Sequence, residues 1–206
     1  MPRRRAGGAR GRIALLHAIA HIELNAIDLA WDLIVRCARL PLPRAFFDDW
    51  VAVADDEARH FQALAGRLAE LDAAYGDLPA HDGLWEAADR TRHDPLARLA
   101  VVPLVLEARG LDVTPPMIDG LTRAGDRASA EILQMIHREE IRHVATGMRW
   151  FRYLSSDHER SPEAIWRDLV AQHFSGQLKP PFNRQARYMA DFPPEFYEPT
   201  DRLTDC

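Results

Sequence analysis

The chain has 206 residues, of which 47% are apolar and 28% are charged, and its formal net charge is -5. This length can bury one sizeable core, so we expect one principal domain with a tail rather than two domains. The negative net charge gives no strong positive field, which makes nucleic acid a disfavoured partner without excluding it. Alternating strand patterns are nearly absent, so the sequence predicts an all-α protein.

The chain begins with a basic run, MPRRRAGGARGR. We predict a flexible tail over residues 1–11, with a phosphate-binding arm as the alternative. The apolar stretch that follows carries two histidines, a glutamate and two aspartates, which makes it too polar for a membrane span, and no signal peptide is evident. Two cysteines, Cys37 and Cys206, make no disulfide framework. These features favour a cytoplasmic protein that does not enter a membrane.

Two long helices are predicted over residues 12–38 and 44–72. In the first, apolar residues recur every three or four positions, and Glu23 lies in the middle of that apolar stripe. In the second, Glu57 and His60 both lie within the stripe. Three residues along a helix give a rotation of about 60° and a rise of about 4.5 Å, so these two side chains can reach one ion.

The heights of these residues along the predicted hairpin agree. Glu23 precedes Arg39 by 16 residues, and Glu57 follows Pro43 by 14 residues. At 1.5 Å per residue, both lie roughly 21 to 24 Å from the turn. Glu23 is therefore expected to face Glu57 and His60 in the core.

Residues 73–94 break the helical period and suit a long crossover that carries the chain to the other end of a bundle. Its two histidines, His81 and His93, have no partners at ligand spacing and are expected on the surface. A third helix is predicted to begin at Asp94-Pro95 and to carry Glu107 on its inner face. Pro103, one turn before Glu107, is expected to kink that helix, either shaping a site or as an incidental feature.

The second pair of helices repeats the first pattern if the turn lies at Gly125-Asp126 and not at Pro115-Pro116. The chain would then continue roughly in line after a proline-induced break, and Glu107 and Glu140 would lie 18 and 14 residues from the turn. The fourth helix is predicted over 126–154, with Glu140 and His143 on its inner face. Glu139 points about 100° away from Glu140 and is expected to be solvated. His137 is expected to be a partly buried histidine, with an outer ligand or a proton carrier as the alternative.

The predicted organisation is a tail over 1–11, a four-helix bundle over 12–154 and an extension over 155–206 that packs on the bundle. The extension should contain an amphipathic helix near 162–175, followed by a segment rich in proline and aromatic residues. It could cap the bundle, cover a pocket or form a dimer contact, and the sequence does not separate these roles. Trp31, Trp50, Trp150 and Tyr153 are interpreted as core or rim aromatics.

Four carboxylates and two imidazoles would share the core of this bundle. Each uncompensated buried carboxylate costs several kcal/mol or must take up a proton. Two divalent ions would balance four negative charges, and oxygen-rich ligation with one imidazole per ion suits iron or manganese. The predicted metal ligands are Glu23, Glu57, His60, Glu107, Glu140 and His143.

The chain resembles the ferritin-like superfamily, and within it an uncharacterised bacterial branch whose function is unknown. The resemblance rests on AHIELNAIDLAWD, DDWVAVADDEARHF, GLWEAADRT, ARLAVVPLVLEARGLDVTP, EEIRHVATGMRWFRYL and PPFN, and it covers most of residues 12–185. It implies a ferritin-like bundle in which Glu23 and Glu107 are terminal ligands and Glu57 and Glu140 bridge the two ions. His60 and His143 would then bind one ion each.

These expectations lead to a functional hypothesis, a di-iron oxidoreductase that activates dioxygen to oxidise or hydroxylate an unidentified small molecule. Manganese or a mixed iron and manganese pair is the alternative metal content, and an external electron donor is expected. Alternative functions are a ferroxidase that handles iron, a tRNA-modifying hydroxylase similar to the one in the superfamily, and a helical protein that binds metal without catalysis. A homodimer is one open form of assembly.

Overall fold

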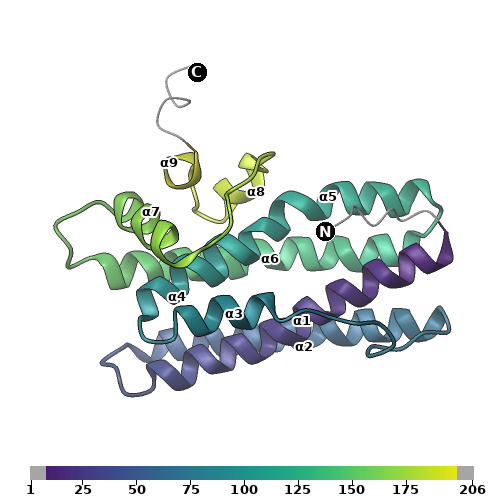
Figure 1. The fold of residues 1–206 in the computed structure, drawn as a ribbon, viewed down its shortest axis with the longest axis horizontal. Coiled ribbons are helices and arrows are strands. Elements are labelled where there is room, and N and C mark those ends of the chain that lie inside the picture. The colour runs from purple at the N-terminus through teal and green to yellow at the C-terminus, as the bar shows by residue number, and fades with distance from the viewer. Residues whose placement is uncertain (1–7, 199–206) are drawn as a thin grey trace. The chain divides into compact units, whose positions relative to one another are not determined.

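The computed structural model describes residues 8–198 as a set of helices joined by loops (Figure 1). The elements are α1 (Ala9–Cys37), α2 (Arg44–Glu70), α3 (Gly83–Arg90), α4 (Pro95–Val101), the π-helix η1 (Val102–Glu107), α5 (Ala108–Arg123), α6 (Arg127–Ser155), α7 (Pro162–His173), α8 (Arg184–Met189) and α9 (Pro194–Tyr197). No strand occurs within residues 8–198. The all-α prediction is therefore confirmed. The predicted tail falls mostly on residues 1–7, outside the described residues, and α1 already begins at Ala9.

The chain divides into two compact units. In the described residues, the first unit comprises 8–35, Pro43–Gly83 and Val113–Glu139. The second unit comprises Arg36–Leu42, Leu84–Asp112 and residues 140–198. Helices α1, α3, α5 and α6 each contribute residues to both units. The division of α6 falls between Glu139 and Glu140, inside a continuous helix.

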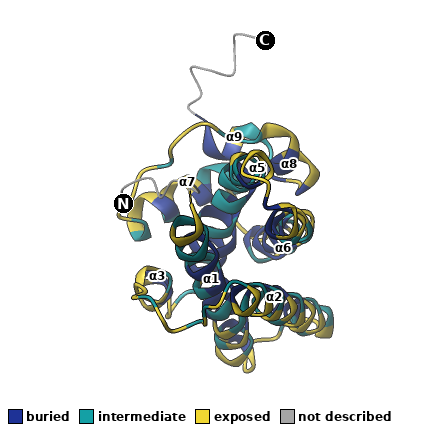
Figure 2. Cartoon of the chain, turned by 90° about the vertical axis from the view of Figure 1, so that its right-hand side faces the viewer, coloured by how far each residue is buried: buried dark blue, intermediate teal, exposed yellow. Residues whose placement is uncertain are grey.

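Four helices share the core of the first unit. Its buried cluster takes side chains from α1, α2, α5 and α6, namely Leu15, Leu16, Ala20, Leu64, Leu68, Leu121, Ala130, Leu133 and Ile136. These positions follow the three- and four-residue spacing of the sequence, so each helix turns one apolar face inward. Figure 2 shows the result as buried and exposed faces on the long helices. The antiparallel pairing of α1 with α2 follows from the short loop between Cys37 and Arg44.

Helix α1 is long and apolar enough to cross a membrane by length and composition alone, with a mean hydropathy of 1.4 over its most apolar window and 44% of that window buried. In the described structure this helix supplies Leu15, Leu16 and Ala20 to the core of the first unit. A core helix of a globular protein meets the same criteria, so its hydropathy is explained by packing.

The second unit is built around buried aromatic side chains from its C-terminal part. Trp166 of α7 is fully buried and packs edge-on against Phe192 and Phe196, with ring centroids 5.5 and 6.0 Å away. Its indole Nε1 donates to the carbonyl oxygen of Ala100 at 3.1 Å. Residues 156–198 are thus a packed part of this unit, in contact with α4.

Two predictions were made for the stretch that leads to α6, a break at the proline pair and a turn after it, and only the turn is confirmed. The predicted break at Pro115-Pro116 is wrong, because α5 continues through both prolines and ends at Arg123. Pro115 removes the amide that would bond to Leu111, and the side chain of Asn183 donates to that carbonyl instead, at 3.1 Å. The turn lies where it was predicted, at Gly125, whose φ of +77° is a left-handed conformation that glycine adopts without strain.

Candidate metal centre

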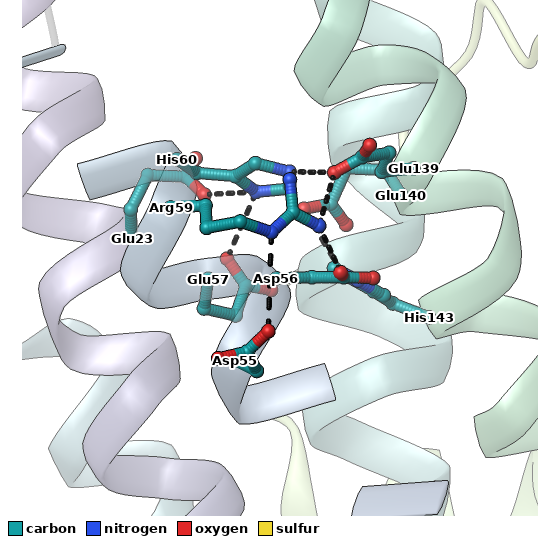
Figure 3. A network of polar contacts seen from close by, with 9 residues as sticks. All are labelled: Glu23, Asp55, Asp56, Glu57, Arg59, His60, Glu139, Glu140 and His143. Carbon is teal, nitrogen blue, oxygen red and sulfur yellow. Dashed lines mark hydrogen bonds and ion pairs between the residues drawn. The ribbon is translucent and has the colours of Figure 1, made fainter. Parts of the chain in front are cut away.

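Three of the predicted ligands meet in the first unit. Glu23 of α1 and Glu57 and His60 of α2 are 4%, 1% and 0% exposed. The Nδ1 atom of His60 lies 3.1 Å from Oε2 of Glu23 and 3.4 Å from Oε2 of Glu57 (Figure 3). The predicted matching of heights in the first hairpin is therefore confirmed.

The local sequence explains why these polar groups are buried together. Glu57 and His60 are one helical turn apart in α2, within a run of buried positions that includes Val53 and Leu64. Glu23 occupies the equivalent level of α1, between the buried residues Ala20 and Ala26. Packing the two apolar faces against each other forces the three polar side chains into the same interior volume.

The other ring nitrogen of His60 contacts a carboxylate that we expected to be solvated. Its Nε2 atom lies 2.9 Å from Oε2 of Glu139, whose side chain is only 22% exposed. Arg59 donates to the same Glu139 oxygen at 3.1 Å and also pairs with Asp56. The expectation for Glu139 is wrong because a rotation of 100° along α6 still leaves a long side chain within reach of α2, as Figure 3 shows.

The charges around His60 alter its protonation. Burial opposes the charged ring, but hydrogen bonds and attraction from Glu23 and Glu57 raise the pKa of His60 to about 10. Burial likewise opposes ionisation of Glu139, but its hydrogen bonds with His60 and Arg59 hold its pKa below the usual value. In the metal-free protein, both ring nitrogens of His60 therefore act as donors to carboxylates.

A divalent ion fits this donor set. Glu23, Glu57 and His60 each offer a ligand atom, and these atoms lie within 4.8 Å of one another. Two buried carboxylates face a single imidazole, so a cation in place of the Nδ1 proton would lower the excess of negative charge. The Nε2 atom would still donate to Glu139, which is how a metal-binding histidine usually uses its second nitrogen.

The other three predicted ligands belong to the second unit. His143 of α6 is 1% exposed, and its Nδ1 atom lies 3.5 Å from Oε1 of Glu140. Glu107 is the last residue of η1 and is half-buried. Glu140 and His143 thus repeat the one-turn spacing of Glu57 and His60 on the inner face of α6.

A close helix contact sets the level of Glu107. A Cβ atom added to Gly147 of α6 would lie 2.7 Å from Cβ of Pro103, so the two backbones approach closely there. The chain runs antiparallel on either side of the turn at Gly125. Position 107, four residues after Pro103, is therefore opposite position 143, four residues before Gly147. This register brings Glu107 to the level of His143.

The predicted kink at Pro103 takes the form of a π-helix. Pro103 has no N–H for the carbonyl of Leu99, and directly after η1 the N–H of Ala108 bonds to the carbonyl of Pro103, five residues earlier, as in a π-helix. The proline in the sequence signalled an irregularity, but periodicity could not reveal its type. Short π-helical stretches are frequent at functional sites, which agrees with the place of Glu107 at the end of this one.

Other residues considered from the sequence lie largely where expected. His81 and His93 are exposed, and His137 is half-buried. Trp50 and Trp150 are both 2% exposed, whereas Trp31 and Tyr153 are 47% and 49% exposed. The sequence analysis missed Glu139 and the close approach at Gly147, although the acidic residues directly before Glu57 and Glu140, which are Asp56 and Glu139, would have justified testing Glu139. Cys206 lies outside the described residues.

Comparison with known proteins places the chain in a family. Residues 1–198 match a family model described as a protein of unknown function, DUF455. The chain belongs to the DUF455 family. This DUF455 protein is also 40% identical over 197 residues to an uncharacterized protein of Haemophilus influenzae, covering 93% of this chain and 68% of that one. No solved structure matches the chain.

Proposed function

We propose that this DUF455 protein holds two divalent metal ions, iron in the first place, and uses them to oxidise a small organic substrate with dioxygen. The six ligands would be Glu23, Glu57, His60, Glu107, Glu140 and His143. The observation that supports this most strongly is the buried group of Glu23, Glu57 and His60, whose ligand atoms lie within 4.8 Å of one another. Bound reduced iron would supply electrons to dioxygen, which accepts electrons only slowly from organic molecules alone.

Charge is the first argument for metal over a purely structural role. Glu23 and Glu57 are both at least 96% buried, since their exposed fractions are 4% and 1%. A structural core gains nothing from two carboxylates and a histidine that apolar residues of similar volume would not provide. Oxygen ligands with a single nitrogen ligand suit iron and manganese better than thiolate-seeking metals.

The second argument is that the same spacing is present twice. Glu57 with His60 in α2 and Glu140 with His143 in α6 each place a carboxylate and an imidazole one turn apart on a buried helix face. A ferritin-like four-helix bundle with a long crossover accounts for both copies and for the cluster shared by α1, α2, α5 and α6. We therefore propose that fold for residues 12–154.

The protein's own side chains would prepare this centre. Glu139 would orient the ring of His60 through Nε2–H, and Arg59 would hold Glu139 in place. The apolar residues above and below the ligands would exclude bulk water, which strengthens each interaction with charge in the interior. The electron donor and the substrate would be further partners of the protein.

The test starts from protein stripped of metal and loaded anaerobically with ferrous ion. We expect two iron ions per chain and, on exposure to air, oxygen uptake with a change in absorbance. The Glu57→Gln variant should lose bound iron, whereas Glu70→Gln, on the exposed end of the same helix, should bind as the wild type does. Absence of iron and manganese binding in the stripped wild-type protein would overturn the proposal.

The same measurement separates oxidation of a substrate from oxidation of iron itself. If ferric ion accumulates beyond two per chain with continued oxygen uptake, the ferroxidase alternative is correct. If uptake ends after the bound iron is oxidised and resumes only with a reductant, the oxidoreductase is supported.

A further inference from the structure

The backbone that carries Glu107 is short of internal hydrogen bonds. Pro103 and Pro115 each lack an N–H, so the regular helical partners of Leu99 and Leu111 are missing. Between these two prolines lie the π-helix η1 and the first turn of α5. A segment built in this way needs donors from elsewhere to keep one conformation.

Side chains of the C-terminal segment supply such donors on both sides of Glu107. Before it, Nε1 of Trp166 donates to the carbonyl oxygen of Ala100 at 3.1 Å. After it, Nδ2 of Asn183 donates to the carbonyl oxygen of Leu111 at 3.1 Å. These two donors come from α7 and from the residue that caps α8.

A third donor reaches the turn that directly follows Glu107. Arg187 is 3% exposed, and its guanidinium donates to the carbonyl oxygen of Ala108 at 3.2 Å and to both carboxylate oxygens of Asp112 at 2.9 and 2.7 Å. The ring of Tyr197 lies 4.4 Å from the guanidinium carbon. The guanidinium thus joins the Ala108 carbonyl to the Asp112 carboxylate, four residues apart on one helical turn, through charge-assisted hydrogen bonds with defined geometry.

We propose that residues 162–198 form a clamp that positions Glu107 as a metal ligand. Its working residues are Trp166, Asn183 and Arg187, which hold the backbone from Ala100 to Asp112. The role of Glu107 rests on the proposed function. The contacts of the clamp with this backbone segment do not involve metal, so their effect on the segment can be measured in metal-free protein.

Two variants remove a donor while keeping most of the packing. Trp166→Phe retains an aromatic ring and loses the indole N–H. Asn183→Ser retains an acceptor that can cap α8 and loses the amide that reaches Leu111. Arg187 is less suitable, because its removal would leave the charge of Asp112 buried.

Each variant has a matched control in the second unit. Trp85→Phe makes the same change at a tryptophan of α3 that is 36% exposed. Arg184→Met removes a donor of α8 whose carboxylate partner, Glu198, lies inside the C-terminal segment. Circular dichroism and thermal unfolding would first show that all four variants are folded.

The first measurement is amide hydrogen exchange of metal-free protein, read by mass spectrometry. In peptides that cover residues 100–112, Trp166→Phe and Asn183→Ser should each exchange about tenfold faster than the wild type. The two controls should leave exchange in these peptides unchanged. Equal exchange in all folded variants would overturn the clamp.

The second measurement is the affinity for Mn²⁺, followed by competition with a chromophoric chelator. We expect the clamp variants to bind one ion as the wild type does and the second about tenfold more weakly. Wild-type affinity for both ions, together with faster exchange, would show that the segment is held but that Glu107 does not depend on it, and would overturn the inference. Absence of Mn²⁺ and iron binding in the wild-type protein would overturn the proposed function and the role of Glu107 with it, whatever the exchange result.

Discussion

At the scale of single residues, Glu139 gives the ring of His60 its orientation. The Nε2 atom of His60 and Oε2 of Glu139 are 2.9 Å apart, while Nδ1 faces Glu23 and Glu57. If a metal ion replaces the Nδ1 proton, Glu139 becomes the group that keeps the ring pointing at the ion. Carboxylates in this position typically change metal affinity by 10- to 100-fold.

Replacing Glu139 should therefore weaken metal binding without unfolding the protein. In Glu139→Leu, Nε2 of His60 loses its acceptor, and we expect the affinity for Mn²⁺ to fall about 10- to 100-fold. Glu139→Gln retains an acceptor oxygen, so its affinity for Mn²⁺ should fall less. Calorimetric titration of the stripped protein would measure both. Glu131→Leu, at an exposed position of the same helix, is the control. Equal affinity in Glu139→Leu and the control would rule out this role.

Asp126 is a second buried carboxylate with defined partners. Its Oδ1 atom accepts from the backbone N–H of Ser129 at 3.1 Å and from Arg67 at 2.8 Å, and Oδ2 accepts from the Ser129 hydroxyl at 2.9 Å. It therefore caps the start of α6 and pairs with α2. Although burial opposes its charge, these hydrogen bonds hold the pKa of Asp126 below the ordinary value of 3.8.

This shift predicts how stability depends on pH. Because the pKa is lower in the folded protein, the ionised Asp126 stabilises the fold above pH 3.8, and this contribution disappears as the pH falls through the folded pKa. Asp126→Asn keeps a capping oxygen but loses the charge, so it should reduce stability by about 1–3 kcal/mol at pH 7. Urea unfolding of both proteins from pH 7 to pH 3 should show the difference shrinking at the acid end. A difference that is constant over this range, or one that also appears in the exposed control Asp119→Asn, would contradict the assignment.

At the scale of elements, the approach of α6 to η1 depends on a missing side chain. A Cβ atom at Gly147 would lie 2.7 Å from Cβ and 2.9 Å from Cγ of Pro103, and a proline ring cannot move aside as a flexible side chain can. The contact is one turn from both His143 and Glu107. The glycine therefore sets the distance between the helix with the histidine and the helix with the glutamate.

Adding a methyl group at Gly147 should push these elements apart. We expect Gly147→Ala to lower stability by about 1–3 kcal/mol and to weaken metal binding, because overpacking shifts backbone. Gly120→Ala in α5 is the matched control, since its added Cβ would meet no heavy atom within 4 Å. That control should be stabilised by roughly 0.5–1 kcal/mol, because alanine favours a helix over glycine. Thermal and urea unfolding would compare the two, and a stabilised Gly147→Ala would contradict this packing.

The elements also show what periodicity could and could not predict. The apolar spacing and the turn residues predicted α1, α2, the helix start at Asp94-Pro95 and the turn at Gly125, because these depend on local chemistry. The passage of α5 through Pro115 was not predicted, since it depends on Asn183, a residue about 70 positions later. Similarly, the contact of Glu139 depends on residues of α2, so the periodicity of α6 alone predicted a solvent-exposed side chain.

At the scale of the whole molecule, the proposed ligands divide equally between the two units. Glu23, Glu57 and His60 belong to the first, and Glu107, Glu140 and His143 belong to the second. A single centre with ligands that bridge both ions would make metal binding in one unit depend on the other. Two independent sites would not. The sequence predicts the single centre through its two matched hairpins, and energetic coupling between the units is the property that distinguishes these arrangements.

Metal binding should therefore protect both units together. With free Mn²⁺ at 100 times its dissociation constant, stabilisation by about 2.7 kcal/mol should slow amide exchange roughly 100-fold both in α2 and in η1. His60→Gln, in the first unit, should remove the protection of η1 in the second unit as well, while His137→Gln, at a half-buried position of α6, should preserve it. If His60→Gln loses protection in α2 alone, the three ligands of each unit bind an ion independently of the other unit. A shared centre that has lost a ligand from the first unit could not keep its full protection of the second.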